Sequence, residues 1–146
     1  MKSRREFLAL LAAAAVAPAV VRADAPPLVE IWKSPQCGCC DDWTKHLQKN
    51  GFATKVNVVA DTTNARRAAG IPEALGSCHT ARVGGYSIEG HVPAKDIRRL
   101  LAEKPRATGL AVPGMPQSAP GMDNPGWPYD VLLVALDGRT SIYQRY

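Results

Sequence analysis

Three cysteines lie within four consecutive positions of this 146-residue chain, at Cys37, Cys39 and Cys40. Cys37 and Cys40 have the CxxC spacing of a redox-active dithiol. A thiolate here can do two kinds of chemistry: it can attack a disulfide, or it can hold a soft metal ion. The third thiol favours the metal, because an extra sulfur invites wrong pairings in a disulfide exchanger but adds a ligand for Cu(I). Thiol–disulfide exchange, with Cys37 as nucleophile and Cys40 as resolving thiol, remains the alternative.

The elements around this cluster are predicted from apolar patterning and from turn residues. They are strands at 28–33 and 52–59, a helix between them at 37–50, a short helix at 61–69, a hairpin with strands at 80–83 and 86–89, and a helix after Pro93 that ends before Pro105. This order predicts an α/β protein with a thioredoxin-like fold, in which the first two strands are parallel. The cysteines then fall where the first strand meets the first helix, and the N–H groups of a helix N-terminus favour thiolates.

The same fold predicts which distant residues approach the cluster. In a thioredoxin-like protein the segment that enters the hairpin crosses over the CxxC, and here that segment contains Cys78 and His79. No proline precedes Thr80, although peptide-binding enzymes of this fold normally have one, and this counts against the exchange alternative. His91, at the end of the hairpin, is a further candidate ligand, with a capping or exposed position as its alternative. His46 is expected to be a solvated residue on the first helix.

A Pro-rich and Gly-rich stretch at 108–128 follows and is predicted to be a loop without strand pairing. It contains Met115 and Met122, whose thioethers suit Cu(I) in an oxidising compartment or, alternatively, fill gaps against the core. Strands at 131–136 and 140–143 are predicted to form a hairpin, with Asp137 and Gly138 in a type I′ turn. The sequence leaves open where this hairpin joins the sheet. Residues 24–146 are expected to form a single thioredoxin-like metal-binding domain.

The N-terminal segment has the pattern of an export signal. Basic residues are followed by an apolar run from Phe7 to Val21 and by small residues around Ala23, and the run is shorter than the roughly 20 residues that span a bilayer. Arg4 and Arg5 lie in a stretch similar to a twin-arginine signal, which exports folded proteins through the twin-arginine translocase. Residues 1–23 are therefore expected to be removed, and the mature protein is expected in the periplasm without a membrane anchor.

Charge and cysteine usage agree with export. Of 18 basic and 13 acidic residues, four basic residues and one acidic residue lie in positions 1–23, so the net charge falls from +5 to +2. No dense basic patch with interleaved aromatic residues remains, which argues against a nucleic-acid partner. Outside the cytoplasm, thiols are expected as disulfides or as metal ligands.

Several motifs together resemble the CopG-type copper-resistance family, long known as a domain of unknown function. They lie at 33–40 with Trp43, at 77–80, at 84–86, at 89–93 and at 109–115. The resemblance covers essentially the whole mature chain and implies a thioredoxin-like fold, a periplasmic setting and copper binding. By position it implies metal-site roles for Cys37, Cys39, Cys40, Cys78, His79 and His91. An oxidoreductase role towards copper ions is compatible with it, so the sequence leaves open whether the protein is an enzyme.

The resulting interpretation is a periplasmic copper-binding protein that serves copper resistance or homeostasis. It would hold one or more Cu(I) ions by thiolates, bridged if several ions bind, because three or four sulfurs are too many for one small ion. The expected partners are copper ions and a periplasmic efflux or copper-delivery protein. The alternative function is a thiol–disulfide oxidoreductase that uses Cys37 and Cys40.

Overall fold

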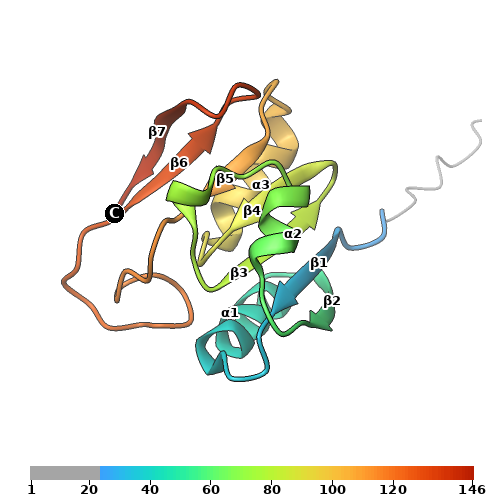
Figure 1. Ribbon diagram of the computed structural model, residues 1–146, viewed down its shortest axis with the longest axis vertical. Helices are drawn as coiled ribbons and strands as arrows, with labels where there is room; N and C mark the ends of the chain where they lie inside the picture. The colour runs from blue at the N-terminus through green and yellow to red at the C-terminus, as the bar shows by residue number, and fades with distance from the viewer. Residues whose placement is uncertain (1–23) are drawn as a thin grey trace, which may run out of the picture.

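The computed structural model describes residues 24–146, and the predicted signal peptide lies outside the described residues. The described chain forms a seven-stranded mixed sheet with the strand order β2-β1-β3-β4-β5-β6-β7 (Figure 1). The strands are β1 (Leu28–Lys33), β2 (Ala53–Val58), β3 (His79–Val83), β4 (Tyr86–Glu89), β5 (Gly109–Ala111), β6 (Asp130–Val134) and β7 (Thr140–Arg145). The helices are α1 (Gly38–Lys49), α2 (Thr63–Ala68), a short 3-10 helix η1 (Glu73–Leu75) and α3 (Ala94–Glu103).

The unit that positions the cysteines is β1, α1 and β2. In β1 the alternate residues Val29 and Ile31 are buried, as expected for a strand with one face in the core. β1 pairs in parallel with β2, and α1 forms the crossover between them. α1 ends at Lys49, and Gly51, two residues later, has a φ of +79°, a backbone conformation that glycine adopts without strain.

The helices lie on both faces of the sheet. Trp43 of α1 and Ile97 of α3 share one core cluster with Leu110 of β5. The neighbouring residue Ala111 points to the opposite face, because successive side chains alternate along a strand, and it belongs to a second cluster with Ala69 after α2. The sheet is therefore covered by α1 and α3 on one side and by α2 on the other.

The predicted α/β, thioredoxin-like fold is confirmed. Strand, helix, strand, helix, hairpin and helix occur in the expected order, with bounds within two residues of the predicted ones. In the β3–β4 hairpin, Gly84 and Gly85 both have positive φ, which is the conformation of a type I′ turn.

The prediction for 108–128 is wrong at its start, because Gly109–Ala111 forms β5. This strand pairs in parallel with β4 and antiparallel with β6. Three small or apolar residues carry little intrinsic strand preference, so the pairing on both sides makes the strand. As a result the C-terminal hairpin extends the main sheet.

The turn of that hairpin also differs from the predicted type. A type I′ turn needs positive φ at both central residues, but of Asp137 and Gly138 the glycine alone has it, at +82°. Ala135 N–H donates to the carbonyl of Arg139 (2.8 Å) and Gly138 N–H donates to the carbonyl of Ala135 (3.0 Å). The loop is therefore three residues long, with glycine in the left-handed position of a bulge.

None of the described helices is long and apolar enough to cross a membrane.

Candidate metal centre

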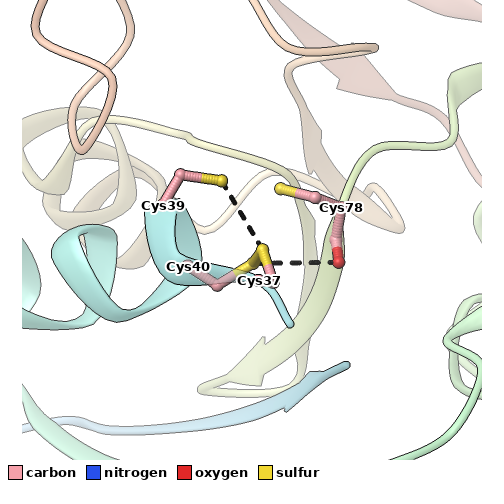
Figure 2. A group of neighbouring side chains, drawn as sticks. All are labelled: Cys37, Cys39, Cys40 and Cys78. Carbon is pink, nitrogen blue, oxygen red and sulfur yellow. Dashed lines mark hydrogen bonds between the residues drawn. A yellow bond between two sulfur atoms is a disulfide. The ribbon is translucent and has the colours of Figure 1, made fainter. Parts of the chain in front are cut away.

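The CxCC cluster is held by the first turn of α1. Cys37 directly precedes the helix, and Cys39 and Cys40 lie in its first turn. Cys37 and Cys40 are joined by a disulfide, with their Cα atoms 5.4 Å apart. Cys39 Sγ lies 3.5 Å from Cys37 Sγ (Figure 2). Cys40 is buried whereas Cys37 and Cys39 are partly exposed, so the cluster is accessible from the side of these two residues.

Cys78 lies directly opposite this turn, in the segment that leads into β3 (Figure 2). The four sulfur atoms of Cys37, Cys39, Cys40 and Cys78 all lie within 4.8 Å of one another. The predicted placement of Cys78 beside the cluster is therefore confirmed. In the part of the chain that the structure describes, Cys39 and Cys78 are free thiols.

His91 adds an imidazole to the cluster in a defined tautomer. Its Nδ1 lies 2.7 Å from the carbonyl oxygen of Pro120 and its Nε2 lies 3.1 Å from Cys78 Sγ. A carbonyl can only accept a hydrogen bond, so Nδ1 carries the proton and Nε2 presents its lone pair to the thiol. Metal-binding histidines commonly have this arrangement, with the second nitrogen donating to a carbonyl.

His79 lies on the buried side of the same cluster. Its ring centroid is 4.2 Å from that of Trp43, and its Nδ1 is 3.5 Å from Cys78 Sγ. Among the described buried side chains, its Nε2 has no hydrogen-bond partner. Cys40, Cys78, His79 and His91 offer ligand atoms within 4.8 Å of one another, so two four-residue groups share Cys40 and Cys78.

These distances suit a metal ion. Thiolate sulfur and imidazole nitrogen bind soft or borderline metals at about 2.0 to 2.3 Å, so donors within 4.8 Å of each other can share one ion with small adjustments. Thiolates together with imidazoles are typical ligands of copper and zinc. The residue types and their spacing therefore fit metal binding.

Burial favours the neutral forms of His79, His91 and Cys78. It lowers the pKa of His79 to about 3, and the neighbouring charges of His91 and Lys33 act in the same direction. Burial likewise lowers the pKa of His91. It raises the pKa of the Cys78 thiol to about 12, and the nearby Cys39 adds to this effect. Both imidazoles could therefore accept a metal ion at neutral pH, whereas Cys78 would have to release a proton to bind one.

Comparison with known proteins identifies the family. Residues 75–122 match a protein family described as "Protein of unknown function, DUF411". Two solved structures, described as "Copper resistance protein copG", Form 1 and Form 2, are each similar to this chain, with 40% identity and a TM-score of 0.78. Each comparison covers 83% of this chain and 98% of the solved chain. The chain belongs to the CopG family. A search of curated protein sequences finds no significant match.

In this CopG-family chain a buried ionic network brackets Cys78 and His79. Glu89 is fully buried, and its Oε1 accepts hydrogen bonds from Arg66 Nε (2.8 Å) and from the backbone N–H of Ser77 (2.8 Å). Its Oε2 accepts a hydrogen bond from the Thr80 hydroxyl (2.6 Å). Arg66 also donates to the carbonyl of Ser77 (2.9 Å). The residues on both sides of Cys78 and His79 are thus fixed to one carboxylate.

Sequence reasoning did not single out Arg66 or the structural role of Glu89. Arg66 comes from α2, and its contacts with Glu89 and Ser77 cross 23 and 11 positions of the chain. No local pattern marks such a contact. The sequence contained one signal for the network: Glu89 is a charged residue at the end of a predicted strand and lies close to a candidate ligand.

The Pro-rich loop of the CopG-family chain packs against the first turn of α1, which carries Cys39 and Cys40. At Gly121 an added Cβ would lie 2.7 Å from the backbone nitrogen of Trp43 and 2.9 Å from the carbonyl oxygen of Cys39, and φ is +91°. A glycine is therefore required at this close approach. The same loop supplies the Pro120 carbonyl that orients His91. Met115 is exposed and Met122 is half-buried.

The expectation for His46 is wrong. This residue is half-buried, and its Nε2 accepts a hydrogen bond from the backbone N–H of Ala94 (3.1 Å). It therefore satisfies one of the unpaired N–H groups at the start of α3. His46 belongs to neither of the two four-residue groups whose ligand atoms lie within 4.8 Å of one another.

Proposed function

We propose that this chain is a copper-resistance protein that binds Cu(I) through its cysteine and histidine cluster. The observation that carries the proposal is the convergence of four sulfur atoms within 4.8 Å at one helix N-terminus. The similar solved structures are described as copper resistance proteins, which supports copper as the metal. The proposed ligands are Cys37, Cys39, Cys40, Cys78, His79 and His91.

Cu(I) suits this donor set because it is a soft ion that prefers thiolates, with imidazole as an additional ligand. The disulfide between Cys37 and Cys40 must first be reduced, which takes two electrons and yields two further thiols. The reduced site then offers four thiols in a small volume. If more than one ion binds, thiolates would bridge the ions.

A specific observation also favours the second candidate, a thiol–disulfide oxidoreductase. The disulfide joins the two residues with CxxC spacing, and Cys37 is partly exposed while Cys40 is buried. This is the asymmetry expected of an attacking and a resolving thiol. Against it, the segment that crosses the disulfide carries Cys78 and His79, and no cis peptide bond occurs among the described residues.

Anaerobic titration with Cu(I) distinguishes the two functions. The protein is reduced, freed of metal and titrated in competition with a chromogenic Cu(I) chelator, and the disulfide form is titrated in parallel. We expect the reduced form to compete strongly and the disulfide form to bind more weakly, because two of its sulfurs are no longer thiolates. Equal and weak competition by both forms, together with rapid reduction of insulin disulfides, would establish the oxidoreductase instead.

We further propose a periplasmic location for residues 24–146 as one domain. The support is the twin-arginine pattern around Arg4 and Arg5, followed by an apolar run too short for a typical membrane span. Copper acquired there would be held, or passed to an efflux or copper-delivery protein.

Replacing both Arg4 and Arg5 by lysine should block export, because the twin-arginine translocase reads this pair. We expect the uncleaved precursor to accumulate in the cytoplasm, as measured by fractionation and immunoblotting. Arg22→Lys, which changes a basic residue outside the pair, serves as the matched control and should be exported normally. Normal periplasmic delivery of the double variant would indicate the general secretory pathway.

A further inference from the structure

The Pro-rich loop makes a tight turn beside the metal centre, at residues 119–122. The backbone N–H of Met122 donates to the carbonyl of Ala119 at 3.0 Å, which closes the turn. Pro120 and Gly121 are its two central residues, and Gly121 has a φ of +91°. Proline followed by a residue with positive φ is the pattern of a type II turn. A type I turn has the same ends, but its central peptide group is rotated by roughly 180°.

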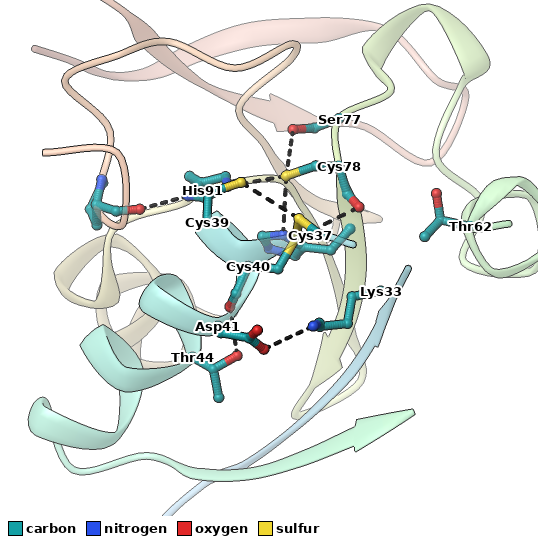
Figure 3. The surroundings of a disulfide bond; sticks show 12 residues. Lys33, Cys37, Cys39, Cys40, Asp41, Thr44, Thr62, Ser77, Cys78 and His91 are labelled. Carbon is teal, nitrogen blue, oxygen red and sulfur yellow. Dashed lines mark hydrogen bonds and ion pairs between the residues drawn. A yellow bond between two sulfur atoms is a disulfide. The ribbon is translucent and has the colours of Figure 1, made fainter. Parts of the chain in front are cut away.

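The central peptide group of this turn is held at both ends. Its carbonyl, from Pro120, lies 2.7 Å from His91 Nδ1. In Figure 3 the dashed line from His91 to this carbonyl leaves the ring on the side away from Cys78. The N–H of the same peptide group, from Gly121, donates to Oδ2 of Asp123 at 3.2 Å. The C=O and N–H of a trans peptide bond point in opposite directions, so Asp123 and His91 lie at opposite ends of one peptide group.

The backbone of Asp123 suits this contact. Its φ of +55° is a left-handed conformation that is uncommon in residues other than glycine but several-fold enriched in aspartate and asparagine. Its N–H donates to the carbonyl of Ala119 at 3.1 Å, which keeps the residue close to the turn. Asp123 is exposed, and among the described residues its carboxylate makes one hydrogen bond, to Gly121. Its side chain therefore acts on the turn through this hydrogen bond rather than through packing.

We propose that Asp123 is a positioning residue of the metal centre, which fixes the peptide group between Pro120 and Gly121 so that its carbonyl faces His91. The inference rests on the proposed function in one respect, that Nε2 of this histidine binds copper. With the carbonyl in place, the imidazole proton stays on Nδ1 and Nε2 keeps its lone pair. If the peptide group rotated, its N–H would face Nδ1 instead. The proton would then have to lie on Nε2, where it blocks the metal ligand.

The charge of Asp123 strengthens the same chain of contacts. A hydrogen bond from a peptide N–H to a carboxylate polarises the peptide group, which makes its carbonyl a better acceptor. An imidazole whose second nitrogen donates to a good acceptor is a better metal ligand, because its metal-binding nitrogen is more basic. Asp123 thus acts on the metal through Pro120 and His91 and does not touch it.

Proton NMR of the metal-free disulfide form tests this contact without copper. In the parent protein a carbonyl holds the Nδ1 proton of His91, so we expect a signal that is protected from exchange with water and is absent in His91→Phe. Asp123→Gly removes the carboxylate but tolerates the positive φ, and it should abolish this signal. Asp123→Asn keeps an oxygen acceptor and also tolerates the positive φ, so it should retain the signal. An unchanged signal in Asp123→Gly would overturn the proposal.

Competition with a chromogenic Cu(I) chelator measures the consequence for the metal. Asp123→Gly should weaken Cu(I) binding by the reduced protein by about tenfold, the lower end of the range for residues that orient a metal ligand. In a His91→Phe background the same substitution should cause no further loss, because the ligand that it positions is absent. An equal loss in both backgrounds would mean that Asp123 supports the fold in general, and would overturn the proposal.

Asp137→Gly is the matched control. Asp137 accepts a hydrogen bond from the backbone N–H of Arg139 at 3.0 Å, so its carboxylate also closes a turn between residues two positions apart, in the β6–β7 loop. This variant should change neither the His91 signal nor the copper affinity. If the reduced parent protein fails to bind Cu(I), the proposed function is wrong, whereas the NMR result on metal-free protein still decides the role of Asp123. The two failures are therefore distinguishable.

Discussion

Cys39→Ser should weaken Cu(I) binding by the reduced protein as strongly as Cys37→Ser does. Both sulfurs belong to the same group of atoms within 4.8 Å of one another, and a metal site loses affinity when any one ligand is removed. The loss should exceed the roughly 10- to 100-fold that follows when a residue that merely orients a ligand is replaced. The measurement is competition with a chromogenic Cu(I) chelator under anaerobic conditions.

The oxidoreductase alternative predicts a different pattern for the same variants. Exchange needs one attacking and one resolving thiol, so Cys39→Ser would leave insulin reduction intact while Cys37→Ser abolished it. Gln36→Ala, in the exposed turn before the cluster, is the control and should preserve copper affinity. If Cys39→Ser retains full copper affinity and reduces insulin rapidly, the copper-cluster proposal is wrong.

Glu89→Gln should destabilise the fold by about 3–5 kcal/mol, because it leaves the buried guanidinium of Arg66 without its fully buried carboxylate. The substitution also replaces one carboxylate oxygen, which accepts a hydrogen bond from Ser77 or Thr80, by an amide NH2 group. Urea unfolding of the metal-free disulfide form, followed by circular dichroism, measures the loss.

Glu73→Gln is the matched control for this prediction. Glu73 pairs with the same guanidinium at 2.9 Å, but its side chain is 68% exposed. Solvent screens such a pair, so this variant should have a much smaller effect. Equal losses in the two variants would contradict the role assigned to the buried network.

Local signals predicted much of the fold. The apolar, β-prone run at Leu28–Lys33 became β1 with the predicted bounds, and Gly84 and Gly85 became the expected tight turn. The thioredoxin-like order of elements then placed Cys78 beside the cysteine turn. This long-range prediction succeeded because the fold, once recognised, fixes which segment crosses the helix N-terminus.

Features created by long-range contacts were not predictable in this way. β5 is a strand because β4 and β6 pair with it on both sides, and His46 is half-buried because the start of α3 packs over it. Arg66 lies on α2, on the face of the sheet away from α1 and α3, and its partner Glu89 is 23 positions away in the chain. None of these contacts leaves a periodic pattern in the sequence.

The cysteine cluster combines residues that are close in the sequence with one that is distant, and this affects how strongly metal binding stabilises the fold. Cys37 and Cys40 are three positions apart and stay close in any conformation, whereas Cys78 joins them through the folded sheet. An unfolded, reduced chain therefore keeps a metal-binding dithiol of its own. A ligand stabilises a fold to the extent that it binds the folded state more tightly than the unfolded state. Bound copper would therefore stabilise this protein by less than the full free energy of copper binding.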